Sequence, residues 1–466
     1  MLTYDFSARG STPRYEYLYQ CLRADILNGT LSEGEKMPSK RELAAANGIS
    51  ISTVVHAYEQ LLTEGYLFSR ERSGYYVASD FNSFLRYQKR TFTRPAPEES
   101  ESWKADFTTN TIVYERFPFS TWTRVMRQVQ SDQGVQLMKR GDFLGSQELR
   151  MALAEYLYHN RGMVVPPDCI VIGTGIEYLY SRLIRLLPVN AVYAVENPGY
   201  RKIPHIYDDN GLQWTWIDMD QDGIRMKSLR ESGASVVHVS PDHHYPLGTG
   251  MSMRRRQELL RWLQESPDRY IIEDDYDCEF RYRGHPLPAL SSLDVSGRII
   301  YMNTFSKTLS PAIRISYMVL PERLLQHYVS SANFFSNTSS SMEQQTLARF
   351  LQDGYFSRHL NRLRKYYRGQ GELLRQAILD TPSIPAAEIS GLATGTHLLV
   401  RLKTALPDSE IKLRARLKGI NLCCLSEYCQ GDTSHWQHTL VLHYPNMEEK
   451  PLREAISMLG SIFEQE

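Results

Sequence analysis

The chain has 466 residues, and its 53 Lys plus Arg balance its 53 Asp plus Glu, so the formal net charge is zero. This balance excludes proteins that coat a polyanion through a large basic excess, but it allows a small DNA-reading module. The 42 % of apolar residues suits a globular protein of about two to four domains. No stretch approaches the roughly 18 apolar residues that cross a bilayer, and the first residues do not resemble a secretory leader. We therefore expect a cytoplasmic protein without a membrane anchor, with reduced cysteines and no metal site.

Residues 1–79 carry the signals of a small helical domain. Apolar residues at helical spacing over 15–27 predict a first helix that ends near Gly29. Ser39 and Glu42 have the spacing of a capping box, which predicts the start of a second helix that ends at Gly48.

The remaining part of this segment predicts one more helix and a hairpin. A third helix is expected from the cap Ser50 to the stop Gly65. Residues 66–79 alternate between apolar and polar side chains around a Ser-Gly turn, which predicts a short β-hairpin. Three helices followed by a hairpin are typical of a winged helix-turn-helix, a DNA-binding module.

A linker is expected at residues 80–105, where the Pro-, Ser- and acid-rich tract TRPAPEESES has no core pattern. From residue 106 to residue 466, helical stretches alternate with short apolar runs, which predicts an α/β domain with a mostly parallel sheet covered on both faces. The apolar runs are 169–173, 190–200, 235–244, 269–277 and 298–307.

Polar residues follow these runs, and ligands of open α/β sheets bind beyond the carboxyl ends of the strands. We therefore expect four segments to converge on one site: 196–200, 242–244, 274–276 and 304–307. Within it, Lys307 at an apolar pocket can form a Schiff base with a carbonyl group. Arg314, with the hydroxyls of Thr304 and Ser306, can hold a phosphate.

Two further features complete this chemistry. Asp274 follows a buried strand and needs a cationic partner, which a protonated pyridine nitrogen would provide. Gly175 follows another strand and precedes a predicted helix, whose N-terminus can receive an anion. An aldehyde, a pyridine nitrogen and a phosphate together describe pyridoxal 5'-phosphate (PLP).

The same residues resemble a known group of proteins. Asp274-x-Tyr276, Ser306-Lys307 and Arg314 resemble the fold-type-I aminotransferases. More narrowly, the chain resembles the MocR subfamily of GntR-type regulators, which join a winged helix-turn-helix to an aminotransferase-like PLP domain. The resemblance covers nearly the whole chain and is carried by residues 38–44, 57–67, 196–201, 271–280 and 301–321.

The resemblance implies a role for each site residue. Lys307 would bind PLP as a Schiff base, and Asp274 would pair with the pyridine nitrogen. The other implied contacts are Tyr276 and His243 near the ring hydroxyl, Tyr200 stacked on the ring, and Thr304, Ser306, Arg314, Gly175 and Ile176 around the phosphate. It also implies a homodimer, arranged head-to-tail.

Two departures from the family pattern concern the substrate carboxylate. Relatives that respond to amino acids have Arg where this chain has Lys202, and a second Arg where it has Asn446. Loss of a charged hydrogen bond costs about 1.5–3 kcal/mol, so an amino-acid ligand is poorly supported unless Lys202 or Arg401 replaces the missing Arg. The simplest interpretation is that PLP itself is the signal, as in PdxR-like regulators of PLP synthesis.

A third departure is the pair Ile176-Glu177, where relatives have Thr or Ser followed by Gln. Glu177 brings negative charge near the expected phosphate, which predicts weaker retention of the cofactor. The structural alternative is that Glu177 only stabilises its helix N-terminus.

The DNA-binding segment is nearly neutral, with eight Lys or Arg minus nine Asp or Glu over residues 1–79, a net of −1. Phosphate contacts dominate DNA affinity, so we expect a dimer on repeated double-stranded half-sites. The residues expected at the DNA are Ser39, Lys40, Arg41, Ser50, Ser52, Thr53, His56, Arg70 and Arg72. Relatives often have Arg at the position of Ile51. An arginine there can hydrogen-bond to guanine, and this chain lacks that contact. The alternative to DNA binding is that this helical domain mediates only protein contacts.

Three functional hypotheses follow. The first is a homodimeric transcription regulator whose DNA binding is modulated by PLP, with little or no turnover, controlling PLP synthesis or a related amino-acid or vitamin pathway. The second is a PLP-dependent aminotransferase with an accessory DNA-binding-like domain. The third is a DNA-binding protein whose second domain no longer binds a cofactor.

Overall fold

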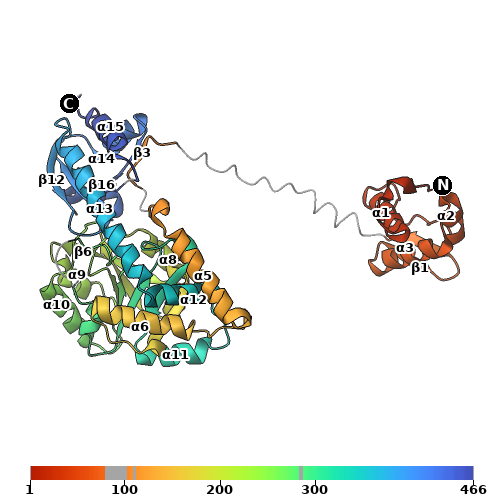
Figure 1. The fold of residues 1–466 in the computed structure, drawn as a ribbon, viewed down its shortest axis with the longest axis horizontal. Helices are drawn as coiled ribbons and strands as arrows, with labels where there is room; N and C mark the ends of the chain where they lie inside the picture. Colours follow the sequence, from red (N-terminus) through yellow and green to blue (C-terminus); the bar gives the residue numbers. More distant parts are fainter. Residues whose placement is uncertain (1, 79–101, 109–111, 283–286, 445, 465–466) are drawn as a thin grey trace. The chain divides into compact units, whose positions relative to one another are not determined.

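The computed structural model describes residues 2–78, 102–108, 112–282, 287–444 and 446–464 (Figure 1). The chain divides into two compact units, residues 1–101 and residues 102–466. Most of the predicted linker, residues 80–105, lies outside the described residues. Its described end, 102–105, belongs to the second unit, where β3 (Ala105–Asp106) pairs with β14 (Ile420–Asn421).

The first unit has the predicted order of elements. It contains a 3-10 turn η1 (Phe6–Arg9), the helices α1 (Arg14–Leu27), α2 (Lys40–Asn47) and α3 (Ile51–Thr63), and the hairpin strands β1 (Leu67–Arg70) and β2 (Gly74–Val77). The strands pair antiparallel, with Arg70 opposite Gly74. The predicted three helices and hairpin are therefore confirmed.

Local signals in the sequence fix the ends of these helices. The Ser39 side chain accepts from the Glu42 backbone N–H and the Glu42 side chain accepts from the Ser39 backbone N–H, so the predicted capping box is formed. Gly48 ends α2 in the left-handed conformation with φ of 61°, which glycine adopts without steric cost. Ser50 caps α3 by accepting from the Thr53 N–H. The ends of α2 and the start of α3 are therefore determined by residues that are close in the chain.

The second unit is built on an eight-stranded sheet with the order β4-β11-β10-β9-β8-β5-β6-β7. Its strands are β4 (Ile170–Thr174), β5 (Val192–Asn197), β6 (Gln213–Asp220), β7 (Gly223–Ile224), β8 (Val236–Val239), β9 (Tyr270–Asp274), β10 (Ile299–Thr304) and β11 (Ile315–Val319). The pairs β10–β9, β9–β8, β8–β5 and β5–β6 are parallel, which confirms the predicted mostly parallel sheet.

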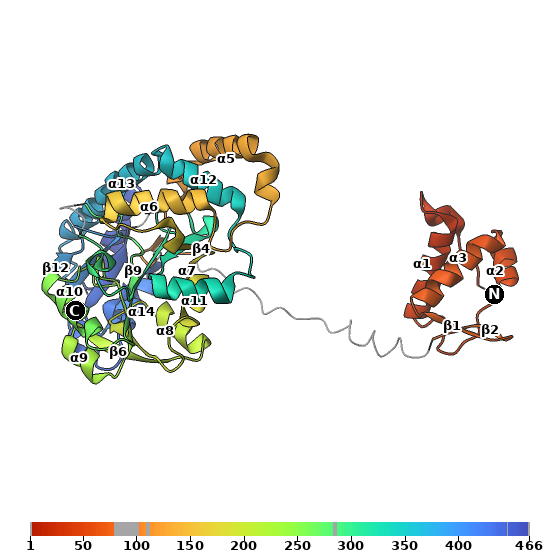
Figure 2. The same ribbon diagram turned by 90° about the horizontal axis from the view of Figure 1, so that it is seen from below.

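Helices cover both faces of this sheet. Successive side chains of a strand point to opposite faces, so a continuous apolar run makes both faces apolar. In β4, Ile170 and Ile172 pack against α5 (Phe119–Gln133), α6 (Gln147–Arg161) and α12 (Ser341–Gln352), whereas Val171 packs against the opposite layer. That layer contains α7 (Ile176–Ile184), α8 (Lys202–Asp209) and α11 (Glu322–Ala332), and the two layers are seen on either side of the sheet in Figure 2. Burial on both faces explains why these strands read as continuous apolar runs.

Strand β11 runs antiparallel to both of its neighbours, β10 and β4. Only residues 305–314 connect β10 to β11, fewer than the dozen or so that a parallel crossover needs. The chain therefore turns back directly, and this short connection contains Lys307 and Arg314.

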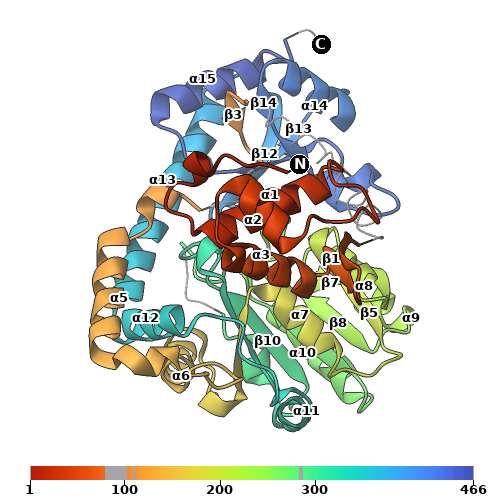
Figure 3. The same ribbon diagram turned by 90° about the vertical axis from the view of Figure 1, so that its right-hand side faces the viewer.

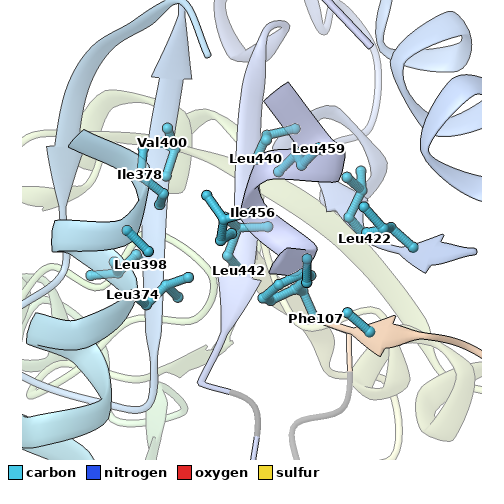
Figure 4. Packing of buried hydrophobic residues seen from close by; sticks show 14 of the residues in the cluster. Phe107, Leu374, Ile378, Leu398, Val400, Leu422, Leu440, Leu442, Ile456 and Leu459 are labelled. Carbon is cyan, nitrogen blue, oxygen red and sulfur yellow. The ribbon is translucent and has the colours of Figure 1, made fainter. Parts of the chain in front are cut away.

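The C-terminal part of the unit forms a second core. Its four-stranded antiparallel sheet has the order β12-β13-β16-β15, from β12 (Ala386–Ser390), β13 (His397–Leu402), β15 (Cys423–Cys424) and β16 (Thr439–His443). The long helix α13 (Tyr355–Leu379) links the two cores, because its first half packs with α6 and α12 and its second half packs here (Figures 1 and 3). Figure 4 shows side chains of α13, β13, β16 and α15 (Glu449–Gly460) pointing toward one another.

The remaining described helices are α9 (Met226–Glu231), α10 (Met253–Gln264) and α14 (Asp408–Leu417), with short 3-10 turns between elements. Each helix in the described ranges is too short or too polar to cross a membrane. The six cysteines, all described, form no disulfide with one another.

Candidate functional site

Strand register brings together residues that are far apart in sequence. Ile315 at the start of β11 pairs with Thr174 at the end of β4, so Arg314 and Gly175 lie beside each other just beyond this pair. In the next strands Met302 of β10 pairs with Asp274 at the end of β9. The ends of β4, β9 and β10 therefore lie at one edge of the sheet, as the sequence predicts.

A cavity of about 300 Å³ lies at this edge. Of the ten residues predicted to bind the cofactor, counting Lys307, eight line it: Ile176, Tyr200, Asp274, Tyr276, Thr304, Ser306, Lys307 and Arg314. Gly175 lies directly next to this wall as the N-cap of α7. Of the four segments expected to converge, 196–200, 274–276 and 304–307 contribute residues to the lining. Residues 242–244 do not, but their neighbours Ser240 and Tyr245 do.

At one end of the cavity, Asp274 is held by a hydrogen-bonded network. The Tyr180 hydroxyl donates to Asp274 Oδ2 over 2.7 Å, and His238 Nε2 lies 3.6 Å from the same oxygen. Behind them, the Tyr207 hydroxyl lies 2.8 Å from His238 Nδ1. The Asp274 side chain is only 14 % exposed, so these contacts fix a carboxylate in a mostly dry site.

Lys307 lies in the middle of the cavity, in the turn that follows β10. Burial lowers the pKa of its amine to about 8, and the Asp277 carboxylate acts in the opposite direction. A lysine with this pKa is partly neutral near pH 8, and the neutral amine is the form that attacks a carbonyl carbon.

Asp277 is in turn held by His243, whose Nδ1 lies 2.8 Å from both carboxylate oxygens. The same nitrogen lies 3.2 Å from the Tyr276 hydroxyl. Burial raises the pKa of Tyr276 well above its ordinary value, so the hydroxyl stays protonated. His243 thus lies behind Tyr276 and does not itself line the cavity, and the prediction that it lies near the ring hydroxyl stays a prediction.

The other end of the cavity holds the residues that are predicted to bind a phosphate, and we call it the anion-binding cradle. A Cβ atom added to Gly175 would lie 2.4 Å from Arg314 Nη2, so a side chain at this position would push the guanidinium away from the start of α7. The Thr304 hydroxyl lies 2.8 Å from Ser306 Oγ and accepts from Ser316 Oγ, also over 2.8 Å. A guanidinium, two hydroxyls and a helix N-terminus form a site that suits a phosphate.

Glu177 also lies at this end. Its Oε2 is 3.3 Å from Arg314 Nη2, and its Oε1 forms an ion pair with Lys202 Nζ. The Lys202 and Arg314 ion pairs lower the pKa of Glu177, although burial acts in the opposite direction. The predicted negative charge is therefore present near the residues expected to bind the phosphate, and it is paired with two cations.

Among the residues considered for binding a substrate carboxylate, Lys202 and Asn446 have other partners and Arg401 lies outside the cavity lining. Lys202 lines the cavity but is paired with Glu177. Asn446 donates to Glu115 Oε2 over 3.0 Å and accepts from the Tyr366 hydroxyl over 2.9 Å, and it does not line the cavity. Arg401 is exposed on β13 and is also outside the lining.

Sequence reasoning missed several residues of the site. Tyr180, Tyr207 and His238 were not predicted, although a histidine within the apolar run VVHV was a visible signal of a buried polar contact. Glu196, which begins the predicted segment 196–200, does line the cavity; its Oε2 accepts from the Ser240 N–H over 3.2 Å, and burial raises its pKa to about 8. No group of metal-ligating side chains within the described part of the chain is arranged to hold a metal ion.

The residues expected at the DNA all lie in the first unit. They occupy the start of α2 (Ser39, Lys40, Arg41), the start and middle of α3 (Ser50, Ser52, Thr53, His56), the end of β1 (Arg70) and the hairpin turn (Arg72). A groove between α2 and β2 is lined by Ser39, Lys40 and Arg41 together with Tyr75, whose ring centroid lies 5.0 Å from Lys40 Nζ.

The start of α3 is partly committed to its own cap. Ser50 Oγ lies 2.8 Å from both Ser52 Oγ and Thr53 Oγ1. His56 and Ile51 are exposed, and Ile51 is 48 % exposed despite its apolar side chain. An exposed isoleucine at the tip of this helix offers an apolar contact where a guanidinium would offer hydrogen bonds.

Comparisons with known proteins match both units. The profile of the bacterial regulatory proteins of the gntR family matches residues 14–77. The chain is 36 % identical to the uncharacterized HTH-type transcriptional regulator YdeL of Bacillus subtilis (strain 168), over 96 % of each chain. It is 31 % identical to the probable rhizopine catabolism regulatory protein MocR of Rhizobium meliloti, over 99 % of this chain and 96 % of that protein.

A more distant relative is the HTH-type pyridoxine biosynthesis transcriptional regulator PdxR of Corynebacterium glutamicum, 27 % identical over 95 % of this chain and 94 % of that protein. Among solved structures, the kynurenine aminotransferase of Pyrococcus horikoshii in complex with PMP has a TM-score of 0.67 at 22 % identity. The match covers 83 % of this chain and 98 % of that chain. The second unit therefore has the fold of the fold-type-I aminotransferases.

Proposed function

Because the chain belongs to the MocR-type GntR transcriptional regulators, which join a helix-turn-helix to an aminotransferase-like domain, we propose that it is a regulator whose DNA binding responds to PLP. The observation that carries this proposal is the cavity with Lys307 between a buried carboxylate and an anion-binding cradle. The cradle at Gly175, where a Cβ atom would meet Arg314 Nη2 at 2.4 Å, is the specific feature that fits a phosphate.

The residues of the cavity suit each part of PLP. When bound, PLP supplies an aldehyde carbon that an amine can attack and a pyridine ring that withdraws electrons. Lys307 would provide the neutral amine, and Asp274, held by Tyr180, would keep a proton on the pyridine nitrogen. Tyr276 would donate to the ring hydroxyl oxygen from its protonated phenol.

The remaining contacts would position the ring. Tyr200 would stack on one ring face, and Thr304, Ser306 and Arg314 would hold the phosphate. His243 would act through Tyr276 and Asp277, which it contacts.

PLP is a better candidate signal than an amino acid. Lys202 is paired with Glu177, and neither Asn446 nor Arg401 lines the cavity. An amino acid would therefore lack a guanidinium fork for its carboxylate, at a cost of about 1.5–3 kcal/mol. The name of the Corynebacterium relative, a pyridoxine biosynthesis regulator, supports control of PLP synthesis or a related pathway.

DNA binding would use a head-to-tail homodimer in the cytoplasm. The first unit alone is close to neutral, so two copies on repeated half-sites would supply the phosphate contacts. PLP would change the placement of the two DNA-binding units, and a tenfold change in DNA affinity requires only about 1.4 kcal/mol of coupling.

A first experiment tests cofactor binding. Purified protein is titrated with PLP, and the visible absorption band of lysine-bound cofactor is recorded for the wild type, for Lys307→Gln and for Lys227→Gln. Lys227 is a surface lysine with an 85 % exposed side chain, so its variant controls for unspecific modification. We expect the band in the wild type and in Lys227→Gln but not in Lys307→Gln. A band that survives in Lys307→Gln contradicts the proposal.

A second experiment tests the signal. DNA fragments selected by the full-length protein from a random-sequence library are bound with and without PLP, and amino acids are then added. We expect PLP to change the affinity and the absorption band to be indifferent to amino acids. An amino acid that shifts the band, with release of a keto acid, would instead favour the aminotransferase hypothesis.

A further inference from the structure

Three charged side chains from three separate elements meet at the anion-binding end of the cavity. Glu177 lies in the first turn of α7, Lys202 is the first residue of α8, and Arg314 precedes β11. All three line the cavity. Their side chains are 37 %, 47 % and 48 % exposed, so each can contact solvent or a ligand.

Glu177 is paired with the Arg314 guanidinium at the N-terminus of α7, the end of a helix that favours anions. A Cβ atom added to Gly175 would lie 2.4 Å from Arg314 Nη2 and 3.0 Å from Glu177 Oε2. Both groups therefore lie against the backbone that begins α7. An incoming phosphate has to share this position with the carboxylate or displace it, because two anions at one guanidinium repel each other.

We propose that Glu177 is a built-in competitor of the cofactor phosphate. Without phosphate, Glu177 neutralises Arg314; with phosphate on Arg314, the carboxylate keeps Lys202 as its cationic partner. The Glu177–Lys202 pair then sets how readily the site releases its ligand. This inference rests on the proposed function and deepens it, because a sensor has to exchange its ligand with the pool that it measures.

The charges give the expected directions. Arg314, Lys202 and Glu177 sum to one positive charge in the wild type. Glu177→Gln raises this sum to two, and Lys202→Gln lowers it to zero and leaves the carboxylate on Arg314 alone. The double variant Glu177→Gln/Lys202→Gln restores the sum of one.

The experiment measures phosphate and PLP affinity in these three variants and in the wild type. Inorganic phosphate is followed by the shift that it causes in thermal unfolding, and PLP by the visible band of lysine-bound cofactor. Because the site is partly exposed, we expect Glu177→Gln to bind both ligands about three- to tenfold more tightly than the wild type. Lys202→Gln should bind more weakly, and the double variant should return toward the wild type.

Glu322→Gln is the matched control. Glu322 is an exposed carboxylate in the first turn of α11, so its variant makes the same charge change at a helix N-terminus outside the cavity. If Glu177 only stabilises its helix, Glu177→Gln should resemble Glu322→Gln, with a lower unfolding temperature and unchanged ligand affinity. That result, or weaker phosphate binding by a folded Glu177→Gln, overturns the inference.

The two proposals fail in different ways. A wild-type protein without a Lys307-dependent band contradicts the proposed function, whereas the phosphate measurement still decides the role of Glu177. If the band forms equally in all variants and phosphate affinity does not change, the proposed function stands and the inference about Glu177 is wrong.

Discussion

The two ends of the cavity are built from different interactions. At the buried end, Asp274 is 14 % exposed and receives a hydrogen bond from Tyr180. At the open end, Arg314 is 48 % exposed and is paired with Glu177. One end is held by hydrogen bonds inside a packed core, and the other is balanced by charges in contact with water.

This difference has an energetic consequence. Charged groups that are desolvated and hydrogen-bonded are expensive to disturb, whereas exposed ion pairs contribute about 0–1 kcal/mol and are screened by salt. We therefore expect the buried end to determine whether PLP is recognised and the open end to determine how long it is held.

The largest expected effect is at Asp274. Asp274→Asn keeps the size of the side chain but removes the charge that would balance a pyridinium, and we expect PLP affinity to fall by about 3 kcal/mol, more than a hundredfold. Arg314→Gln should cost about 1 kcal/mol, because its guanidinium is already partly neutralised and exposed. Absorption titrations with PLP measure the affinity of both variants. Equal losses in the two variants would remove the distinction between the ends.

Next in size is the hydrogen bond that orients Asp274. Tyr180→Phe removes the donor 2.7 Å from Asp274 Oδ2, and we expect about tenfold weaker PLP binding, near 1.4 kcal/mol. Tyr178→Phe on the same helix is the control, because the Tyr178 hydroxyl contacts Arg182 and lies outside the cavity. The same loss in both variants would point to a general disturbance of α7.

A smaller effect is expected in the pH dependence of covalent attachment. The pKa of Lys307 is lowered to about 8, so the rate of band formation should rise with pH through a midpoint near pH 8 and level off at higher pH. Asp277 raises this pKa, so Asp277→Asn should move the midpoint to lower pH, by less than about one unit. Stopped-flow absorption at several pH values measures the midpoint, and a shift to higher pH would be the wrong sign.

The smallest effect is expected from salt. Raising NaCl from about 0.05 M to about 0.5 M shortens the Debye length, so the attraction between PLP and the exposed charges of the open end is screened. We expect this screening to weaken PLP binding only a few-fold. The salt dependence should be steeper in Glu177→Gln, which has more uncompensated charge, than in the wild type. Identical slopes, measured by titration, would argue that the open end does not act through its net charge.

The sequence was most informative where structure depends on neighbours in the chain. The capping box of Ser39 and Glu42, the left-handed Gly48 and the hairpin turn are local features, and each is present where it was expected. The strands that are buried on both faces were also recognisable, because they are continuous apolar runs. Strand β6 was not predicted, since its half-exposed residues 213–220 form no such run.

Which residues share the cavity was predicted in part. The chemistry of Lys307, Asp274 and Arg314 depends on residue type, so the sequence could suggest it. The network of Tyr180, His238 and Tyr207 behind Asp274 could not be predicted, because its members come from α7, β8 and α8 and meet only through packing.

By itself, the sequence determined the order of elements and the helix ends of the first unit, the buried strands β4, β5, β8, β9 and β10 of the second unit, and the types of groups available for chemistry, because these follow from local propensity and burial pattern. Only the tertiary structure decided that β11 turns back to place Arg314 beside Gly175, that His243 lies behind Tyr276, and that Glu177 joins Lys202 to Arg314. These outcomes depend on the register and distance between segments that are remote in the chain, and the energy of a Coulomb interaction depends on that distance.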